Sequence, residues 1–174
     1  MKLDTRGEFA KAYRRYAQPI YRFMYWQTRD PVLSEDLTSA VFERSWRARA
    51  SFNGGSRQAW LYRIARNLLT DHWRKKKELL LDDIPGLADQ LTAQPMGYEA
   101  HSYDFDNEQR VRQLGTALDR LPSNLKAVVV LRFIEELSAR EVAEILETTE
   151  GNVRVLQLRA LRKMRGWMED ESTR

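Results

Sequence analysis

Trp60-Leu-Tyr-Arg-Ile-Ala-Arg-Asn67, running on to Asp71-His-Trp-Arg-Lys-Lys-Lys77, places aromatic rings, guanidinium groups and an amide on one short helix. Apolar residues recur at i, i+1, i+4 and i+8, which predicts one buried stripe made of Trp60, Leu61, Ile64 and Leu68. Away from this stripe the helical wheel places Arg63, Arg66, Thr70 and Arg74, with Tyr62 and Trp73 beside them and Asn67 at the edge. Cations hold phosphate and rings stack on unpaired bases, so this side suits nucleic acid. A solvated basic helix whose tryptophans are core explains the same residues.

A second signal lies near the other end of the chain. Leu137-Ser-Ala-Arg-Glu-Val-Ala-Glu-Ile-Leu146 predicts a short amphipathic helix with a capping box, because Glu141 follows Ser138 by three residues. After a tight connection, a second helix is predicted from about Glu150 to Trp167. Its buried stripe is predicted to be Val153, Leu156, Ala160, Met164 and Trp167. Its opposite side carries Asn152, Val155, Arg159 and Arg162, flanked by Arg154 and Leu158. The pair indicates a DNA-binding helix-turn-helix, with an ordinary helical hairpin as the alternative.

Composition limits the class of protein. The 174 residues allow one domain or two small ones, and a hydrophobic content of 43% is enough for packed cores. There is no Cys, and the two histidines, His72 and His101, have no ligand-spaced partner, so neither a metal site nor a cofactor is expected. No apolar run reaches transmembrane length and the N-terminus lacks a signal-peptide stretch. We therefore expect a cytoplasmic protein with no membrane insertion.

Charge divides the chain into three parts. Residues 1–77 carry 17 Lys and Arg against 7 Asp and Glu, residues 78–109 carry 8 acids and no Lys or Arg, and residues 110–174 carry 12 against 10. Pro85-Gly86 and Pro95-Met-Gly97 are loop signals within the acidic part. We predict an all-α protein of two small helical domains, 1–77 and 110–174, joined by an acidic flexible linker, 78–109.

Helix signals fill both domains. The first domain is predicted to hold helices over about 8–28 and 33–50 and the Trp60 helix, which ends in the run Arg74–Lys77. Pro19 predicts a kink or break in the first of these helices, whose inward stripe is Phe9, Tyr13, Tyr16, Ile20 and Phe23. In the second domain a helix is predicted over about 108–121, and Pro122 opens another whose core residues are Val128, Leu131 and Phe133.

These motifs together resemble the extracytoplasmic-function (ECF) sigma factors, the small two-domain branch of the sigma-70 family. Ser34-Glu-Asp-Leu-Thr-Ser-Ala-Val-Phe42 is similar to the region 2 motif that binds the polymerase clamp. Ala59–Asn67 with Asp71 and Arg74 is similar to the promoter-melting and −10 segment. Leu118-Asp-Arg-Leu-Pro122, Val130-Leu-Arg132 and the helix-turn-helix are similar to region 4. The resemblance covers nearly the whole chain, with both halves in the family's order.

The resemblance implies a transcription initiation factor rather than an enzyme. Its partners would be core RNA polymerase, through clamp and flap, promoter DNA, and an anti-sigma factor held between the two domains. It assigns clamp binding to Glu35, Asp36, Ser39 and Glu43. It assigns −10 DNA binding to Phe52, Asn53, Ser56, Trp60, Tyr62, Arg63, Arg66, Asn67, Trp73 and Arg74. It assigns −35 DNA binding to Asn152, Arg154, Val155, Leu158, Arg159 and Arg162.

Two positions depart from the family pattern. Ser39 stands where the family usually has Gln, and the segment Val155-Leu-Gln-Leu158 replaces a more polar and basic pattern. Val155 and Leu158 are off the predicted buried stripe, so they either touch thymine methyl groups, pack on another protein, or weaken DNA contact. The family's optional C-terminal extension is expected to be absent, since the sequence stops just after Trp167.

Other classes of protein account for parts of the sequence. A conventional helix-turn-helix regulator would explain the C-terminal half but not the aromatic and basic helix of the N-terminal half. A helical adaptor that binds only proteins would explain the acidic linker but not the exposed arginines. A nucleic-acid enzyme is disfavoured because the sequence shows no nucleophile elbow, phosphate loop or metal-ligand cluster.

Overall fold

The computed structural model describes residues 6–52, 54–83 and 105–172, and within these residues every regular element is helical. The chain divides into two compact units, Met1–Thr92 and Ala93–Arg174. The predicted all-α fold class is confirmed. Most of the acidic segment 78–109, including His101, lies outside the described residues.

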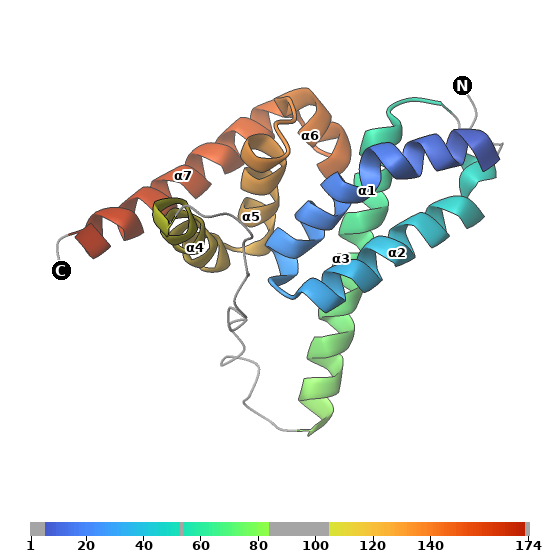
Figure 1. Ribbon diagram of the computed structural model, residues 1–174. Helices are drawn as coiled ribbons and strands as arrows, with labels where there is room; N and C mark the ends of the chain where they lie inside the picture. Colours follow the sequence, from blue (N-terminus) through green and yellow to red (C-terminus); the bar gives the residue numbers. More distant parts are fainter. Residues whose placement is uncertain (1–5, 53, 84–104, 173–174) are drawn as a thin grey trace. The chain divides into compact units, whose positions relative to one another are not determined.

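In the first unit, the residues that the structure describes form three long helices and a short one. They are α1 (Arg6–Thr28), α2 (Pro31–Arg47), the 3-10 turn η1 (Arg49–Ser51) and α3 (Arg57–Asp83). Figure 1 shows α1 and α2 as an antiparallel pair joined by a short turn, with α3 crossing them. All three contribute to one core, whose innermost side chains are Ile20, Phe23, Met24, Val41, Leu61, Tyr62 and Ala65.

The corner between α1 and α2 is held by local polar contacts. Arg29 ends α1 with a left-handed φ of 57°, and its guanidinium lies over the rings of Tyr25 and Trp26 at 5.2 and 4.9 Å. Asp30 then caps α2, because its Oδ1 accepts a 3.0 Å hydrogen bond from the Leu33 N–H and Pro31 supplies the first helical residue. The corner therefore fixes the register of α2 against α1.

The described residues of the second unit form four α-helices and one π-helical turn. They are α4 (Phe105–Asp119), α5 (Ser123–Val129), η3 (Val130–Ile134), α6 (Ala139–Leu146) and α7 (Glu150–Ser172). Helix α7 packs against α4, α5 and α6, and Figure 1 shows it as the long C-terminal helix of the unit. The innermost core side chains are Leu118, Val128, Val130, Leu131, Val142, Ile145, Val153 and Ala160.

The predicted buried face of α3 is only partly right, since Leu61 is buried as expected but the centre of the face is shifted. Tyr62, which we expect on the outer side, has no exposed surface, and Leu61, Ala65 and Leu69 are buried with it. Trp60, Ile64 and Leu68 are only partly buried. The physical reason is an aromatic contact from another helix, because the ring of Tyr62 meets the ring of Phe23 on α1 edge-on, with centroids 5.4 Å apart.

Four smaller expectations also need correction. Phe133 is 49% exposed and is not core, because η3 inserts a π-turn that shifts the helical phase at this point. Tyr13 is exposed although its ring contacts Phe42. Pro19 does not break α1, which runs on to Thr28. Helix α3 continues to Asp83 rather than ending at Lys77.

Candidate polymerase and nucleic-acid interfaces

The outer face of α2 is polar from Glu35 onward, after an exposed Val32 in the first turn. Glu35, Asp36, Ser39 and Glu43 are all exposed, as the sequence predicts, while Ser34, Leu37, Thr38, Val41, Phe42 and Ser45 are buried on the other side. The buried hydroxyls of Ser34 and Thr28 are 2.8 Å apart, and Thr38 donates to the Ser34 carbonyl at 2.6 Å. The Thr28–Ser34 contact joins the end of α1 to α2, whereas the Thr38 bond lies within α2. With its other side buried, α2 presents its carboxylates as an acidic strip that can bind a basic surface.

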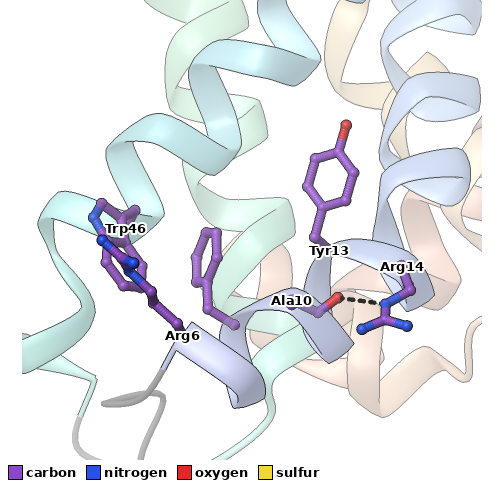
Figure 2. Close-up of a pocket in the computed structure, with 6 residues that line it drawn as sticks. Arg6, Ala10, Tyr13, Arg14 and Trp46 are labelled. Atoms are coloured by element: carbon purple, nitrogen blue, oxygen red, sulfur yellow. Dashed lines mark hydrogen bonds between the residues drawn. The ribbon is translucent and has the colours of Figure 1, made fainter.

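A surface hollow lies between α1 and α2, and no motif in the sequence indicates it. Figure 2 shows Arg6, Tyr13 and Arg14 from α1 and Trp46 from α2 around it, and Phe9 and Ala10 complete its lining. The ring of Phe9 meets that of Trp46 with centroids 4.9 Å apart. Two arginines around an aromatic floor are readable in the sequence only when α1 and α2 are known to pair.

The loop before α3 is fixed at both ends. Gly54 and Gly55 have φ of 91° and 105°, a region that only glycine adopts without strain. The Ser56 hydroxyl then accepts a 3.1 Å hydrogen bond from the Ala59 N–H and caps α3. Phe52, expected at the DNA surface, is instead buried, because its ring packs on Trp60 at 5.1 Å and on Ala12. Asn53 lies outside the described residues.

The outer side of α3 keeps most of the predicted polar set. Asn67 and Arg74 are exposed, and Arg63 and Arg66 are partly exposed. Arg74 pairs with Asp71 at 3.5 Å, and the same carboxylate lies 3.8 Å from Arg44 on α2, which the sequence analysis does not single out. Tyr62 is absent from this surface because it is part of the core.

Trp73 and its neighbours form an aromatic and cationic group on the distal half of α3. Trp73 is partly exposed, Lys76 lies over its ring at 5.4 Å, and His72 meets the ring edge-on at 5.1 Å. Partial burial lowers the pKa of His72, the nearby charge of Lys76 lowers it further, and Asp30 opposes both. His72 is therefore neutral at physiological pH, and the cations of this group are Lys76 and the neighbouring Lys75 and Lys77.

The start of α7 is built by the tight turn after α6. The predicted capping box of α6 is confirmed, with the Ser138 hydroxyl accepting from the Glu141 N–H and the Glu141 carboxylate accepting from the Ser138 N–H at 2.8 Å. Glu147 ends α6 in the left-handed region, with φ of 54°. Thr149 Oγ1 then accepts a 3.2 Å hydrogen bond from the Asn152 N–H. The turn therefore sets the angle at which α7 leaves α6.

The predicted division of α7 into a buried and an exposed side is confirmed. Val153, Ala160 and Met164 are buried, and Leu156 and Trp167 are partly buried. On the other side the structure exposes all six predicted residues: Asn152, Arg154, Val155, Leu158, Arg159 and Arg162. Within the described part of the chain, neither Arg159 nor Arg162 pairs with an acidic side chain. A helix of this kind presents cations to phosphate and side chains to base edges.

Comparison with known proteins identifies the family of each unit. Residues 12–78 match the Sigma-70 region 2 family and residues 111–164 match the Sigma-70 region 4 family. The ECF RNA polymerase sigma factor SigX of Bacillus subtilis is 31% identical over 163 residues, which are 92% of this chain and 84% of SigX. The ECF RNA polymerase sigma factor BldN of Streptomyces coelicolor is 30% identical over 172 residues, 94% of this chain but 61% of BldN.

The chain is an ECF sigma factor of the sigma-70 family. Its fold is also that of the sigma factor RpoE, solved with the anti-sigma factor NepR from Bartonella quintana, with a TM-score of 0.78 at 19% identity over 93% of this chain and 97% of RpoE. CnrH, solved with the cytosolic domain of CnrY, gives a TM-score of 0.71 at 17% identity over 96% of this chain and 91% of CnrH.

Membership of this family establishes the general activity. This sigma factor is a transcription initiation factor that binds core RNA polymerase and promoter DNA and directs promoter recognition and initiation. None of its helices, in the residues that the structure describes, has the combined length and apolar character needed to cross a bilayer.

Proposed function

We propose that three exposed helical faces of this sigma factor each bind a different partner. The acidic strip of α2 binds the polymerase clamp, the outer side of α3 with the loop before it binds opened −10 DNA, and the outer side of α7 binds the −35 duplex. The observation that carries the proposal is common to all three helices. Each has one side buried in its own unit and leaves the described polar residues of its site exposed or partly exposed.

For the clamp, the supporting feature is charge on a rigid helix. Glu35, Asp36 and Glu43 place three carboxylates on the exposed side of α2, and Ser39 adds a hydroxyl between them. Opposite charge across an interface steers association and fixes orientation. The short hydroxyl of Ser39 reaches less far than a glutamine would, so the carboxylates carry most of this contact.

Pull-down with purified core RNA polymerase tests the clamp assignment. Asp36→Arg places a cation where an anion is expected, so binding should fall by at least tenfold while the isolated protein keeps its helicity. Gln18→Arg adds a cation at an exposed position of α1, outside the acidic strip and the acidic segment, and serves as the control. Equal binding by the two variants would remove α2 from the clamp interface.

For the −10 element, the supporting feature is a set of cations and rings around an exposed amide. Arg63, Arg66 and Arg74 can hold backbone phosphates, and Trp60 and Trp73 offer partly exposed ring faces to unpaired bases. Asn67 can make paired hydrogen bonds to the edge of an extruded base. The capped loop that ends at Ser56 borders this surface, so region 2 captures and holds DNA once it is melted.

For the −35 element, the supporting feature is the geometry of a helix-turn-helix. Helix α7 follows α6 as the second helix of the helix-turn-helix. Its exposed residues Asn152, Arg154, Arg159 and Arg162 lie where major-groove readers lie in such motifs. The same unit would contact the polymerase flap. The acidic segment 78–109 would join the two DNA-binding units along basic surfaces of the polymerase.

Two further features of the proposal come from relatives. RpoE and CnrH were solved with an anti-sigma factor and with the cytosolic domain of CnrY, respectively. By analogy, an anti-sigma factor would bind this chain and compete with core polymerase. The chain would act in the cytoplasm, where polymerase is, and would supply binding and positioning rather than covalent catalysis.

A further inference from the structure

The outer side of α7 carries two large apolar side chains among its arginines. Val155 is 45% exposed and Leu158 is 50% exposed. Their neighbours on this side are Arg159 and Arg162. About half of each side chain is thus accessible at the centre of a cationic helix face. Both side chains are therefore available to whatever α7 binds.

Several polar side chains of the same helix are already engaged. Asn152 donates from Nδ2 to Thr148 Oγ1 at 2.9 Å, and Arg154 pairs with Glu150 at 3.2 Å. Gln157 accepts a 3.2 Å hydrogen bond from Arg132 Nε, and the Arg132 guanidinium also donates to the Leu137 carbonyl. Val155 and Leu158 are exposed in the same part of α7. Because their side chains are apolar, they have no hydrogen bond or ion pair that DNA would have to replace.

We propose that Val155 and Leu158 read thymine methyl groups at the −35 element. This inference rests on the proposal that α7 enters the major groove. There, a thymine presents its C5-methyl group, and no other base presents an apolar group at that edge. A valine and a leucine can bury such methyls, whereas they can make no hydrogen bond to a guanine or cytosine edge.

Charge favours DNA over a protein partner as the occupant of this face. From Gly151 to Trp167 the chain contains five basic residues, Arg154, Arg159, Arg162, Lys163 and Arg165, and no acidic one. A protein-binding face at this density of like charge would need a strongly acidic partner, whereas DNA supplies phosphates on both sides of its groove. The apolar pair lies between arginines that reach those phosphates.

Spacing makes the inference specific. Val155 and Leu158 are separated by about 4.5 Å along the helix axis, at about 1.5 Å per residue. Successive base pairs are about 3.4 Å apart. The two side chains therefore reach the same or neighbouring base pairs, so sensitivity to thymine methyls should be confined to one or two adjacent positions.

Replacement of thymine by deoxyuridine isolates this contact, because the two bases pair identically and differ only by the C5-methyl group. A −35 duplex is first obtained by selecting a randomised segment with the full-length protein in holoenzyme. Each thymine on either strand is then replaced singly, and holoenzyme affinity is measured. At one or two adjacent base pairs we expect affinity to fall about fourfold, the effect of leaving one methyl-sized group unburied.

Two variants tie the effect to the side chains. In Val155→Ser and Leu158→Asn the penalty for deoxyuridine should disappear at the position that each residue contacts, as in a double-mutant cycle. Leu114→Asn is the control. Leu114 is 36% exposed but lies on α4, outside the proposed DNA-binding helix. It should leave the deoxyuridine penalty unchanged.

Each result has a distinct meaning. If no deoxyuridine substitution weakens binding while Arg159→Ala and Arg162→Ala do, methyl reading is overturned and α7 still binds DNA. If the arginine variants also bind normally, the assignment of α7 to the −35 element itself fails. If Val155→Ser lowers affinity for core polymerase in the absence of DNA, the apolar pair contacts protein, and the proposal is rejected.

Discussion

Asp119 Oδ1 and Lys126 Nζ are 2.7 Å apart and join the end of α4 to the middle of α5. The two side chains are only 14% and 9% exposed. Removing two charges from water costs several kcal/mol per ion, and the attraction between them offsets that cost only while both are present. The pair therefore acts as a positional constraint on α5, which in turn packs against α7.

Removal of one partner should be strongly destabilising. Asp119→Ala leaves the Lys126 ammonium buried without this carboxylate, and we expect the second unit to lose about 3–5 kcal/mol. Since the two units need not unfold together, hydrogen exchange at α5 amides is the suitable measurement. Glu150→Ala breaks the exposed pair with Arg154 in the same unit and should cost at most about 1 kcal/mol. Equal losses of stability in both variants would show that the buried Asp119–Lys126 pair stabilises the unit no more than an exposed pair does.

Helical periodicity in the sequence predicts elements that bury one face against their own unit. The capping box of α6 and the two sides of α7 follow from residue spacing alone, since Ser138, Glu141 and the apolar positions of α7 act within one helix or its immediate turn. The polar strip of α2 is equally local. These are the features from which most of the candidate site is built.

Contacts between helices determine the features that the spacing of residues along the sequence does not predict. Tyr62 reads as an amphipathic surface residue, but its ring packs on Phe23 from another helix. Phe52 reads as a loop aromatic available to DNA, but Trp60 covers it. Phe133 keeps a core spacing until the π-turn η3 shifts the phase. Such tertiary contacts, and the hollow beside Trp46, are invisible in the periodicity of any single segment.

Asn67 should contribute to binding of opened −10 DNA and not to binding of the −35 duplex. Asn67→Ala removes an exposed amide proposed to read an extruded base, so run-off transcription from duplex promoters should fall and the preference at one −10 position should change. Binding to a −35 duplex should stay unchanged. If Asn67 mainly helps opening, a pre-melted −10 bubble should restore part of the activity, and if it reads the base, little should return.

Thr70→Ala provides the control for this experiment. Thr70 is also exposed on α3, but its hydroxyl donates to the Arg66 carbonyl of its own helix at 2.9 Å. It should transcribe like the wild type on matched duplex and bubble templates with every −10 base varied. If Asn67→Ala does the same on all of them, the −10 pocket lies elsewhere in the first unit.

Glu147 offers a way to stabilise the helix-turn-helix by relieving backbone strain. Its backbone is left-handed, with φ of 54° and ψ of 47°, a conformation that costs an L-residue roughly 1–2 kcal/mol. Glu147→Gly should relieve this strain and raise the stability of the second unit by up to about 1 kcal/mol. Glu144→Gly, within α6 and also exposed, should lower it by about 1 kcal/mol. A loss of stability in both variants would mean that Glu147 makes contacts worth more than its strain.

The capping box of α6 should contribute to the stability of the second unit by an amount that depends on pH. The Ser138 hydroxyl and backbone N–H both donate to Glu141, at 2.6 and 2.8 Å, and these hydrogen bonds lower the pKa of the Glu141 carboxyl. When the pKa of a carboxyl is lower in the folded than in the unfolded chain, the group stabilises the fold at pH values above its unfolded pKa. For glutamate the unfolded pKa is about 4.3. That contribution is lost as the pH falls through the folded pKa.

Ser138→Ala tests this coupling directly. The variant loses the hydroxyl bonds to Glu141, so at neutral pH it should be less stable than the wild type by about 1 kcal/mol. In acid below the folded pKa, the wild type has a neutral Glu141 carboxyl, so the difference between the two proteins should shrink. Hydrogen exchange at α6 amides at both pH values measures it, and Glu144→Gln, which removes a neighbouring charge but leaves the box intact, should keep the wild-type pH dependence. An unchanged difference in acid would show that the hydroxyl cap works without the carboxylate.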